Sequence, residues 1–273
     1  RVLTENYYYV DKTRYIDDLE KTAAFLFLIR PRRFGKSLFL SMLYCYYDVR
    51  YADKFDELFG NQYIGKHPTG EQGKYLVLYF NFSAVRGTGQ ALEDNFNGYA
   101  KIQMEGFADQ YASYFEPGFP KEIRELKTAA DQLNFIGKRA AMLGVPIYLL
   151  IDEYDNFTNT ILSSEGNNVY RALTHDSGFY RGFFNIVKAI TTGPDAPVKR
   201  MFITGVSPVT LDDVTSGFNI GTNITTDEQF NSMVGFSESE LFDMLSYYQS
   251  EGMLADPIDD IVRMIKPWYD NYC

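Results

Sequence analysis

Short apolar runs alternate with longer polar-apolar stretches along most of this 273-residue chain. The runs cover residues 24–29, 75–80, 145–151 and 199–204. Each is short and bounded by glycine, proline or charge, which is typical of strands buried on both faces of a sheet. Strands that alternate with helices predict βαβ crossovers and a mainly parallel sheet. We therefore expect an α/β fold.

The stretches between these runs predict helices over residues 37–47, 89–114, 122–143 and 170–190. A turn-rich stretch over 206–235 interrupts the pattern. After it, Ser237-Glu-Ser-Glu240 matches a capping box that begins a helix, and Asp256-Pro257 predicts the start of another. We expect residues 1–235 to form the core, and residues 236–273 to be the start of a helical lid or winged-helix-like appendage that this chain truncates.

The composition restricts the classes of protein that the chain can represent. Apolar residues make up 45% of the chain and include 22 Tyr and 22 Phe, which argues against disorder. The longest apolar run, residues 23–29, is far shorter than the ~18 residues that span a bilayer, so we expect no membrane span. A net charge of −10 argues against an extensive nucleic-acid surface. Only Cys45 and Cys273 occur, which favours a reducing, cytoplasmic setting without a disulfide framework.

A basic loop stands between the first predicted strand and the first predicted helix. In residues 30–37 (RPRRFGKS), Gly35, Lys36 and Ser37 match the end of the GxxxxGK[ST] phosphate-binding pattern, while Arg30 occupies the first glycine position. The residues expected to bind a nucleotide are Arg32, Arg33, Phe34, Gly35, Lys36, Ser37 and Leu38. Lys36 is expected to reach the β- and γ-phosphates, and the Ser37 hydroxyl to ligate Mg²⁺. The alternative for the same residues is a basic turn that caps a core helix.

A second motif ends the third predicted strand. Residues 145–153 (VPIYLLIDE) form an apolar run that ends in Asp152 and Glu153. Asp152 is expected to hold Mg²⁺, and Glu153 to orient and deprotonate an attacking water. Both motifs fall at the carboxyl ends of strands, where open parallel sheets bind their ligands. A glutamate directly after the aspartate favours ATP hydrolysis over transfer to a metabolite, although such a strand end alone is often a solvated loop start.

The fourth predicted strand ends in residues 204–208 (TGVSP). If this strand lies between the first and the third, Thr204, or as a second choice Ser207, would contact the γ-phosphate or the lytic water. A Ser or Thr that merely caps a turn is an equal alternative. Asp155 is expected to orient a basic group or tie down its loop. An arginine finger cannot be chosen among Arg171, Arg181 and Arg200.

Taken together, these motifs resemble the predicted AAA-ATPase-like family of bacterial proteins. This divergent AAA+-related group often carries a PD-(D/E)xK nuclease-type domain at its C-terminal end. The matching stretches are residues 8–13 (YYVDKT), 30–37, 151–155 (IDEYD), 204–208, 216–219 (SGFN) and 235–238 (GFSE). The form RPRRFGKS is specific to the family, so Arg30 is a family trait, and residues 268–272 (WYDNY) resemble its aromatic motif.

The resemblance implies a P-loop NTPase three-layer sandwich with a five-stranded sheet in the order 5-1-4-3-2. Its implied activity is Mg-dependent binding and hydrolysis of ATP, with ATP and Mg²⁺ as cofactors, to drive or switch an attached or partner module. Tyr9 and Val10 are implied to lie near the adenine. The implied partners are further subunits of a homo-oligomer and a C-terminal nuclease-type domain outside this chain. A non-hydrolysing nucleotide-binding scaffold remains the alternative, and a P-loop kinase is disfavoured.

Overall fold

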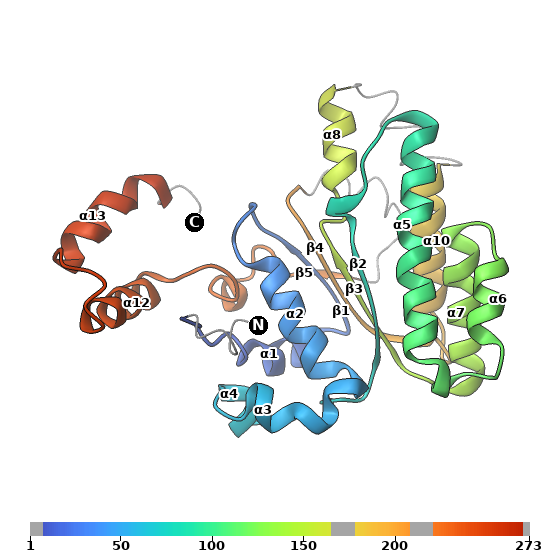
Figure 1. Cartoon of the computed structure of the whole chain (residues 1–273), viewed down its shortest axis with the longest axis horizontal. Helices are drawn as coiled ribbons and strands as arrows, with labels where there is room; N and C mark the ends of the chain where they lie inside the picture. The colour runs from blue at the N-terminus through green and yellow to red at the C-terminus, as the bar shows by residue number, and fades with distance from the viewer. Residues whose placement is uncertain (1–7, 165–177, 208–220, 270–273) are drawn as a thin grey trace.

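The computed structural model describes residues 8–164, 178–207 and 221–269, which form a sheet flanked by helices (Figure 1). The sheet has the strand order β2-β3-β4-β1-β5, and its pairs are parallel. Its strands are β1 (Phe25–Ile29), β2 (Leu76–Asn81), β3 (Ile147–Asp152), β4 (Val198–Gly205) and β5 (Thr222–Asn223). This is the predicted order 5-1-4-3-2 read from the opposite edge. The predicted α/β class is therefore confirmed.

Four of the strands coincide with the apolar runs in the sequence. Their side chains are buried on both faces, β3 completely, as the runs predicted. The fifth strand lies inside the turn-rich stretch over 206–235, where no strand was assigned from the sequence. Its two residues are exposed and pair with Leu26 and Phe27 of β1. A strand of this length carries no alternation of apolar and polar residues from which it could be recognised.

One face of the sheet is covered by helices of the middle of the chain (Figure 1). They are α5 (Gly89–Gln110), α6 (Phe119–Glu125), α7 (Ala129–Leu143) and α10 (Phe179–Thr191), with α8 (Asn156–Ser164) following β3 and short 3₁₀ turns at η2 (Phe82–Ala84) and η3 (Ala112–Tyr114). Aromatic rings fill the space between these helices and the sheet and include those of Phe82, Phe96 and Phe183.

Two of the predicted helices differ from the structure. The helix expected over 122–143 is wrong in its continuity, because α6 ends at Glu125 and α7 begins at Ala129. Thr128 causes the break by capping α7, since its side chain accepts the backbone N–H of Asp131 at 3.1 Å. The helix expected over 89–114 ends as an α-helix at Gln110 and closes in the turn η3.

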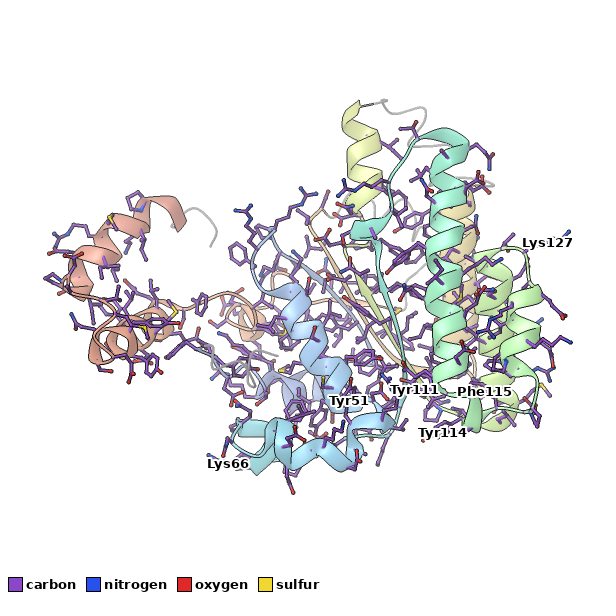
Figure 2. All side chains as sticks on the ribbon, viewed as in Figure 1. Tyr51, Lys66, Tyr111, Tyr114, Phe115 and Lys127 are labelled. Carbon is purple, nitrogen blue, oxygen red and sulfur yellow. The ribbon has the colours of Figure 1, made fainter. Side chains whose placement is uncertain are left out.

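The other face of the sheet carries the N-terminal helices. They are α1 (Tyr15–Thr22), α2 (Lys36–Tyr47), the 3₁₀ turn η1 (Val49–Lys54), α3 (Phe55–Phe59) and α4 (Tyr63–Lys66). A second apolar core lies beneath them, with Leu26 and Leu28 of β1 packed against α2. Figure 2 shows side chains filling the space on both sides of the sheet, with Tyr51 and Tyr111 at its lower end. Two cores around one sheet make a three-layer sandwich.

The chain ends in two helices that extend away from the sheet (Figure 1). After the turn η4 (Glu228–Phe230), these are α12 (Glu238–Ser250) and α13 (Ile258–Tyr269). The predicted capping box is confirmed, because Ser237 accepts the N–H of Glu240 while the Glu240 carboxylate accepts the N–H of Ser237. In the ranges that the structure describes, no helix has the length and apolar character needed to cross a membrane.

Candidate functional site

The basic loop joins β1 to α2 at the carboxyl edge of the sheet. Its backbone turns through two left-handed residues, Arg33 at φ 69° and Gly35 at φ 82°. Such a conformation is uncommon for a residue other than glycine, and alternation of right- and left-handed residues directs successive N–H groups into one concavity. No side chain caps the start of α2. Its first N–H groups, unpaired within the helix, therefore form an anion-binding end.

Lys36 is the first residue of α2, and its side chain reaches back to the start of the loop. Its ammonium group donates to the carbonyl oxygens of Arg30 and Pro31, both at 2.9 Å, and the residue is only 5% exposed. Burial lowers the pKa of Lys36 from its ordinary value, against the charges of Asp152 and Glu153, which raise it. Because an ammonium has three donors, one beyond these two carbonyl contacts remains to reach a phosphate.

Two of the three arginines in the loop, Arg30 and Arg32, contact neighbouring segments. Arg30 adopts no left-handed conformation, which explains how it can replace a glycine. Its guanidinium donates to the carbonyl oxygen of Thr225 and to Asn231 Oδ1, the latter at 3.3 Å. Arg32 is exposed and donates to Asn156 Oδ1 at 3.2 Å. Arg30 thus fixes the loop to the segment after β5.

Asp152 connects the loop to the strand ends. This aspartate is completely buried, and its Oδ2 accepts the Ser37 hydroxyl at 2.5 Å while its Oδ1 accepts the Thr204 hydroxyl at 2.5 Å. Asn81 donates to Oδ2 at 3.4 Å. The structure therefore brings together Ser37, Asp152 and Thr204. The Thr204 hydroxyl is hydrogen-bonded to the Asp152 carboxylate.

Asn81 was missed by the sequence reasoning. It is the last residue of β2 and lies opposite Asp152 in the register of β2 against β3. The signal that identifies it is the strand register, because a polar residue at the end of an adjacent parallel strand lies at the same ligand-binding edge.

The oxygens around Asp152 fit a hard divalent cation. A serine hydroxyl and a carboxylate are ligands that Mg²⁺ prefers, and Mg²⁺ commonly takes one or two protein carboxylates and completes its shell with water and substrate phosphates. In the described part of the chain, no group of three or more His, Cys, Asp or Glu side chains has metal-binding geometry. The Ser37 hydroxyl and the Asp152 carboxylate supply two oxygen ligands of the kind that Mg²⁺ takes from a protein.

Residues 153–155 interlock with the end of β4. Glu153 is half-buried and left-handed at φ 51°, a conformation that turns the chain directly after the strand. The buried Asp155 carboxylate accepts the N–H groups of Val206 at 3.0 Å and Ser207 at 2.5 Å, so it ties down its loop. Gly205 is required here, because a Cβ atom would lie 2.2 Å from the Tyr154 ring.

A hollow of about 210 Å³ lies beside the loop. It is lined by residues 8–12 in part, by 33–35, by one side of α2 at Leu38, Phe39 and Met42, and by 233–236. Tyr9, Val10, Phe34 and Leu38, all named from the sequence, contribute to it. Its walls are largely apolar, and its volume is below the ~300–1,000 Å³ of sites that enclose a whole drug-sized ligand. It therefore suits one flat apolar group, such as a nucleobase.

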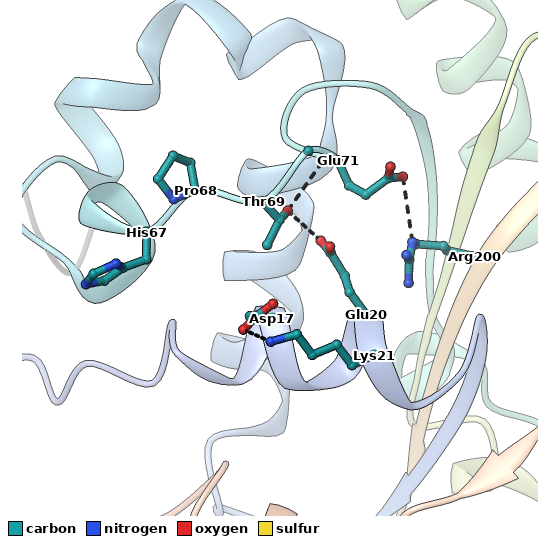
Figure 3. Close-up of a pocket in the computed structure, with 9 residues that line it drawn as sticks. Asp17, Glu20, Lys21, His67, Pro68, Thr69, Glu71 and Arg200 are labelled. Carbon is teal, nitrogen blue, oxygen red and sulfur yellow. Dashed lines mark hydrogen bonds and ion pairs between the residues drawn. The ribbon is translucent and has the colours of Figure 1, made fainter.

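A larger hollow, of about 660 Å³, lies at the opposite edge of the sheet (Figure 3). Its charged groups are engaged with one another: Lys21 pairs with Asp17 at 2.5 Å, and Arg200 lies 3.9 Å from Glu71. Arg200 stands at the amino end of β4, away from the phosphate loop. It therefore cannot serve this chain's own site, while Arg171 and residues 216–219 lie outside the described residues.

The parallel sheet, the loop with its buried lysine and the acidic strand end define the class of P-loop NTPases. The family model described as "Predicted AAA-ATPase" matches residues 1–215, and the chain belongs to this family. It is 26% identical over 278 residues to an "Uncharacterized protein in vnfD 5'region" of Azotobacter chroococcum mcd 1. That match covers 98% of this chain and 45% of the relative, so the chain spans less than half the relative's length.

Two solved structures are also similar. Cdc6p from Pyrobaculum aerophilum has a TM-score of 0.37 and 14% identity, over 85% of this chain and 44% of that one. The ORC2 protein of Aeropyrum pernix, in its ADPNP-ADP complexes, has a TM-score of 0.36 and 13% identity, over 86% of this chain and 48% of that one.

Proposed function

We propose that this chain binds ATP with Mg²⁺ and hydrolyses it. The observation that carries the proposal is the 2.5 Å hydrogen bond from Ser37 to Asp152, which joins the phosphate loop to the acidic strand end beside the buried Lys36. A basic turn that only capped α2 would not need a buried lysine aimed into it, or a buried carboxylate bonded to its serine. Membership in the family supports the same function.

The phosphate end of the site uses the loop and the start of α2. Backbone N–H groups of residues 32–37 surround the phosphates, with Arg33 and Lys36 supplying positive charge. Ser37 and Asp152 hold Mg²⁺. When bound, Mg²⁺ neutralises charge on the phosphate oxygens and orients them. Thr204 and Asn81 fix the orientation of the Asp152 carboxylate through the hydrogen bonds described above.

Glu153 is the general base of the proposed reaction. Its carboxylate accepts a proton from a water molecule as the water oxygen bonds to the γ-phosphorus and the bond from that phosphorus to the bridging oxygen breaks. Support comes from its place next to Asp152, on a backbone held in an uncommon conformation.

The base of the nucleotide occupies the 210 Å³ hollow. Tyr9 and Val10 form one wall, and Phe34 and Leu38 form the wall on the side of the loop. An aromatic base in such a hollow is held by apolar burial and ring contacts, for which aromatic residues are suited. The triphosphate then extends along the loop toward Ser37.

We further propose that hydrolysis drives or switches a module outside the core. The curated relative is more than twice as long as the part that this chain matches, which leaves room for such a module. The helices α12 and α13, as the start of the appendage, are the part of this chain that would transmit the change. Assembly into a homo-oligomer, with an arginine supplied by a neighbouring subunit, belongs to the same proposal.

Binding and turnover can be separated experimentally. A calorimetric titration with a non-hydrolysable ATP analogue and Mg²⁺ is expected to show saturable binding, and a phosphate-release assay with Mg-ATP is expected to show turnover. Binding without release would support the non-hydrolysing scaffold instead. If the chain shows neither binding nor phosphate release, every P-loop interpretation of it is contradicted.

A further inference from the structure

The motif at residues 8–13, here called the N-terminal strap, is fixed at one end to α4. The Asp11 carboxylate accepts the N–H of Tyr63 at 2.6 Å and the N–H of Thr13 at 2.8 Å. The Thr13 hydroxyl in turn accepts the N–H of Ile64 at 3.1 Å. The strap is therefore anchored to the body of the protein immediately after the residues that line the 210 Å³ hollow.

Lys12 connects the strap to the opposite wall of that hollow. Its ammonium group donates to both carboxylate oxygens of Glu240, at 2.6 and 2.7 Å, and to the carbonyl oxygen of Ser232 at 2.7 Å. These contacts join Lys12 to residues 220 and 228 positions away in the chain. The side chain of Lys12 is only 11% exposed. All three ammonium donors point to acceptors in residues 232–240, so none is left to contact a phosphate.

Glu240 has a second role in the same place. Its carboxylate accepts the N–H of Ser237 at 2.7 Å and so completes the capping box of α12. Burial by itself would raise the pKa of Glu240, but the hydrogen bonds from Lys12 and Ser237 and the charge of Lys12 lower it below its ordinary value. The carboxylate is thus charged and fixed at neutral pH.

The wall that Lys12 holds is the segment 233–236. It includes Gly235, which is left-handed at φ 78° and lies so close to Phe34 that a Cβ atom would be 3.2 Å from the ring. The segment begins one residue after Ser232 and ends one residue before the cap of α12, so both of its ends are tied to Lys12. Losing the ion pair would free this wall to move away from the strap.

We infer that Lys12 is a positioning residue for the nucleobase, which keeps the strap and the segment 233–236 closed on the base and contributes nothing to phosphate binding. This inference rests on the proposed function, because it assumes that a nucleotide is bound. It assigns a role to the motif at residues 8–13, which phosphate and metal binding alone do not explain. It also predicts that one substitution separates recognition of the base from recognition of the phosphates.

The test compares two ligands, Mg-ATP and Mg-tripolyphosphate, which lacks the base. The variant Lys12→Met removes the charge and keeps most of the side-chain length. The matched control is Lys21→Met, which makes the same change at a 71%-exposed lysine paired with Asp17 on α1. Calorimetric Kd values for both ligands, together with thermal unfolding, are measured for the parent and each variant.

Lys12→Met is expected to weaken Mg-ATP binding about tenfold to a hundredfold, as loss of a partly buried, hydrogen-bonded charge pair does, while the Kd for Mg-tripolyphosphate stays within about twofold. Lys21→Met should change neither value. Unchanged Mg-ATP binding, or equal weakening of both ligands, would overturn the inference. If Lys12→Met does not fold, Glu240→Gln, which removes the charge but keeps an acceptor for the cap, is judged by the same two ligands. A parent protein that binds neither ligand contradicts the proposed function itself.

Discussion

The phosphate end and the base end of the candidate site are built in different ways. At the phosphate end, Lys36, Ser37 and Asp152 are buried or locked by hydrogen bonds of 2.5 to 2.9 Å, with acceptors and donors on the sheet and the loop itself. At the base end, apolar side chains from four separate segments line the hollow. One ion pair, between Lys12 and Glu240, joins its walls.

The two ends should therefore contribute differently to the affinity and the specificity of nucleotide binding. At the phosphate end, Lys36, Ser37 and Asp152 each have directional hydrogen-bond partners, and charged hydrogen bonds of this kind are the strong ones. The base end depends on how closely its walls approach, because apolar contact has no preferred direction. Substitutions at the phosphate end should therefore affect every phosphate-containing ligand, whereas those at the base end should affect only ligands with a base.

The largest effect is expected from Lys36→Ala. It removes the only buried cation of the described loop, and with it charge-assisted contacts that contribute ~1.5–3 kcal/mol each. Binding of Mg-ATP and of Mg-tripolyphosphate should both weaken about a hundredfold or more in a calorimetric titration. Lys66→Ala, at an exposed lysine of α4, is the control and should change neither. Retained binding of both ligands in Lys36→Ala would show that the buried lysine does not bind the phosphates.

Asp152→Asn is expected to remove most of the dependence on Mg²⁺. The amide keeps the shape of the side chain but loses the charge that holds the cation, and its NH₂ group faces a hydroxyl that now donates to the carboxylate. Mg-ATP affinity should fall about tenfold, while affinity for ATP measured in EDTA should change by less than about threefold. An unchanged ratio of the two affinities would remove Asp152 from the proposed metal site.

Gly235→Ala probes the base end. A Cβ atom there is strained by the left-handed backbone and lies 3.2 Å from the Phe34 ring, so the wall must shift. Mg-ATP binding should weaken about threefold to tenfold and Mg-tripolyphosphate binding should not change, a cost of ~1 kcal/mol.

Gly252→Ala is the matched control for this substitution. It is also left-handed, at φ 71°, but has open space around it. Gly252→Ala should lower the temperature of unfolding about as much as Gly235→Ala does, because both place a Cβ atom on a left-handed backbone. It should not change the affinity for Mg-ATP or for Mg-tripolyphosphate. If Gly252→Ala weakens Mg-ATP as much as Gly235→Ala does, contact with Phe34 is not the cause.

The smallest effect on binding is expected from Arg30→Gly, which restores the usual glycine of the pattern. Arg30 directs its guanidinium toward Thr225 and Asn231 rather than into the loop. Removing it should cost ~1–2 kcal/mol of folding stability, seen as a lower temperature of unfolding, and change Mg-ATP affinity by less than about threefold. A large gain in affinity would mean that the arginine distorts the phosphate loop.

The residues of the proposed phosphate end could be named from the sequence because they are contiguous with recognisable strands. Residues 30–37 and 145–153 each join an apolar run to polar residues in a fixed order. Strand β4 lies between β1 and β3, and this order brings Thr204 next to Asp152. The four long strands were predicted for the same reason, since burial on both faces leaves a continuous apolar run.

The remaining features depend on contacts that no local pattern encodes. Asn81 reaches Asp152 only through the register of β2 on β3, and the partner of Lys12 lies 228 residues away. The capping of α7 by Thr128 divides a stretch whose composition alone favours one helix. Tyr9 and Val10 were named by resemblance, but the opposite wall at residues 233–236 was not identified, because it is assembled by tertiary packing.

The role of Glu153 is tested most directly by a single-turnover experiment with protein in excess over Mg-ATP. The parent and Glu153→Gln are compared at matched nucleotide occupancy, and the conversion of bound ATP to ADP and phosphate is followed over time. The assignment of Glu153 as general base predicts that both proteins bind ATP with similar Kd values and that Glu153→Gln converts ATP about 10²–10⁴-fold more slowly. Equal rates of conversion in the two proteins would contradict it.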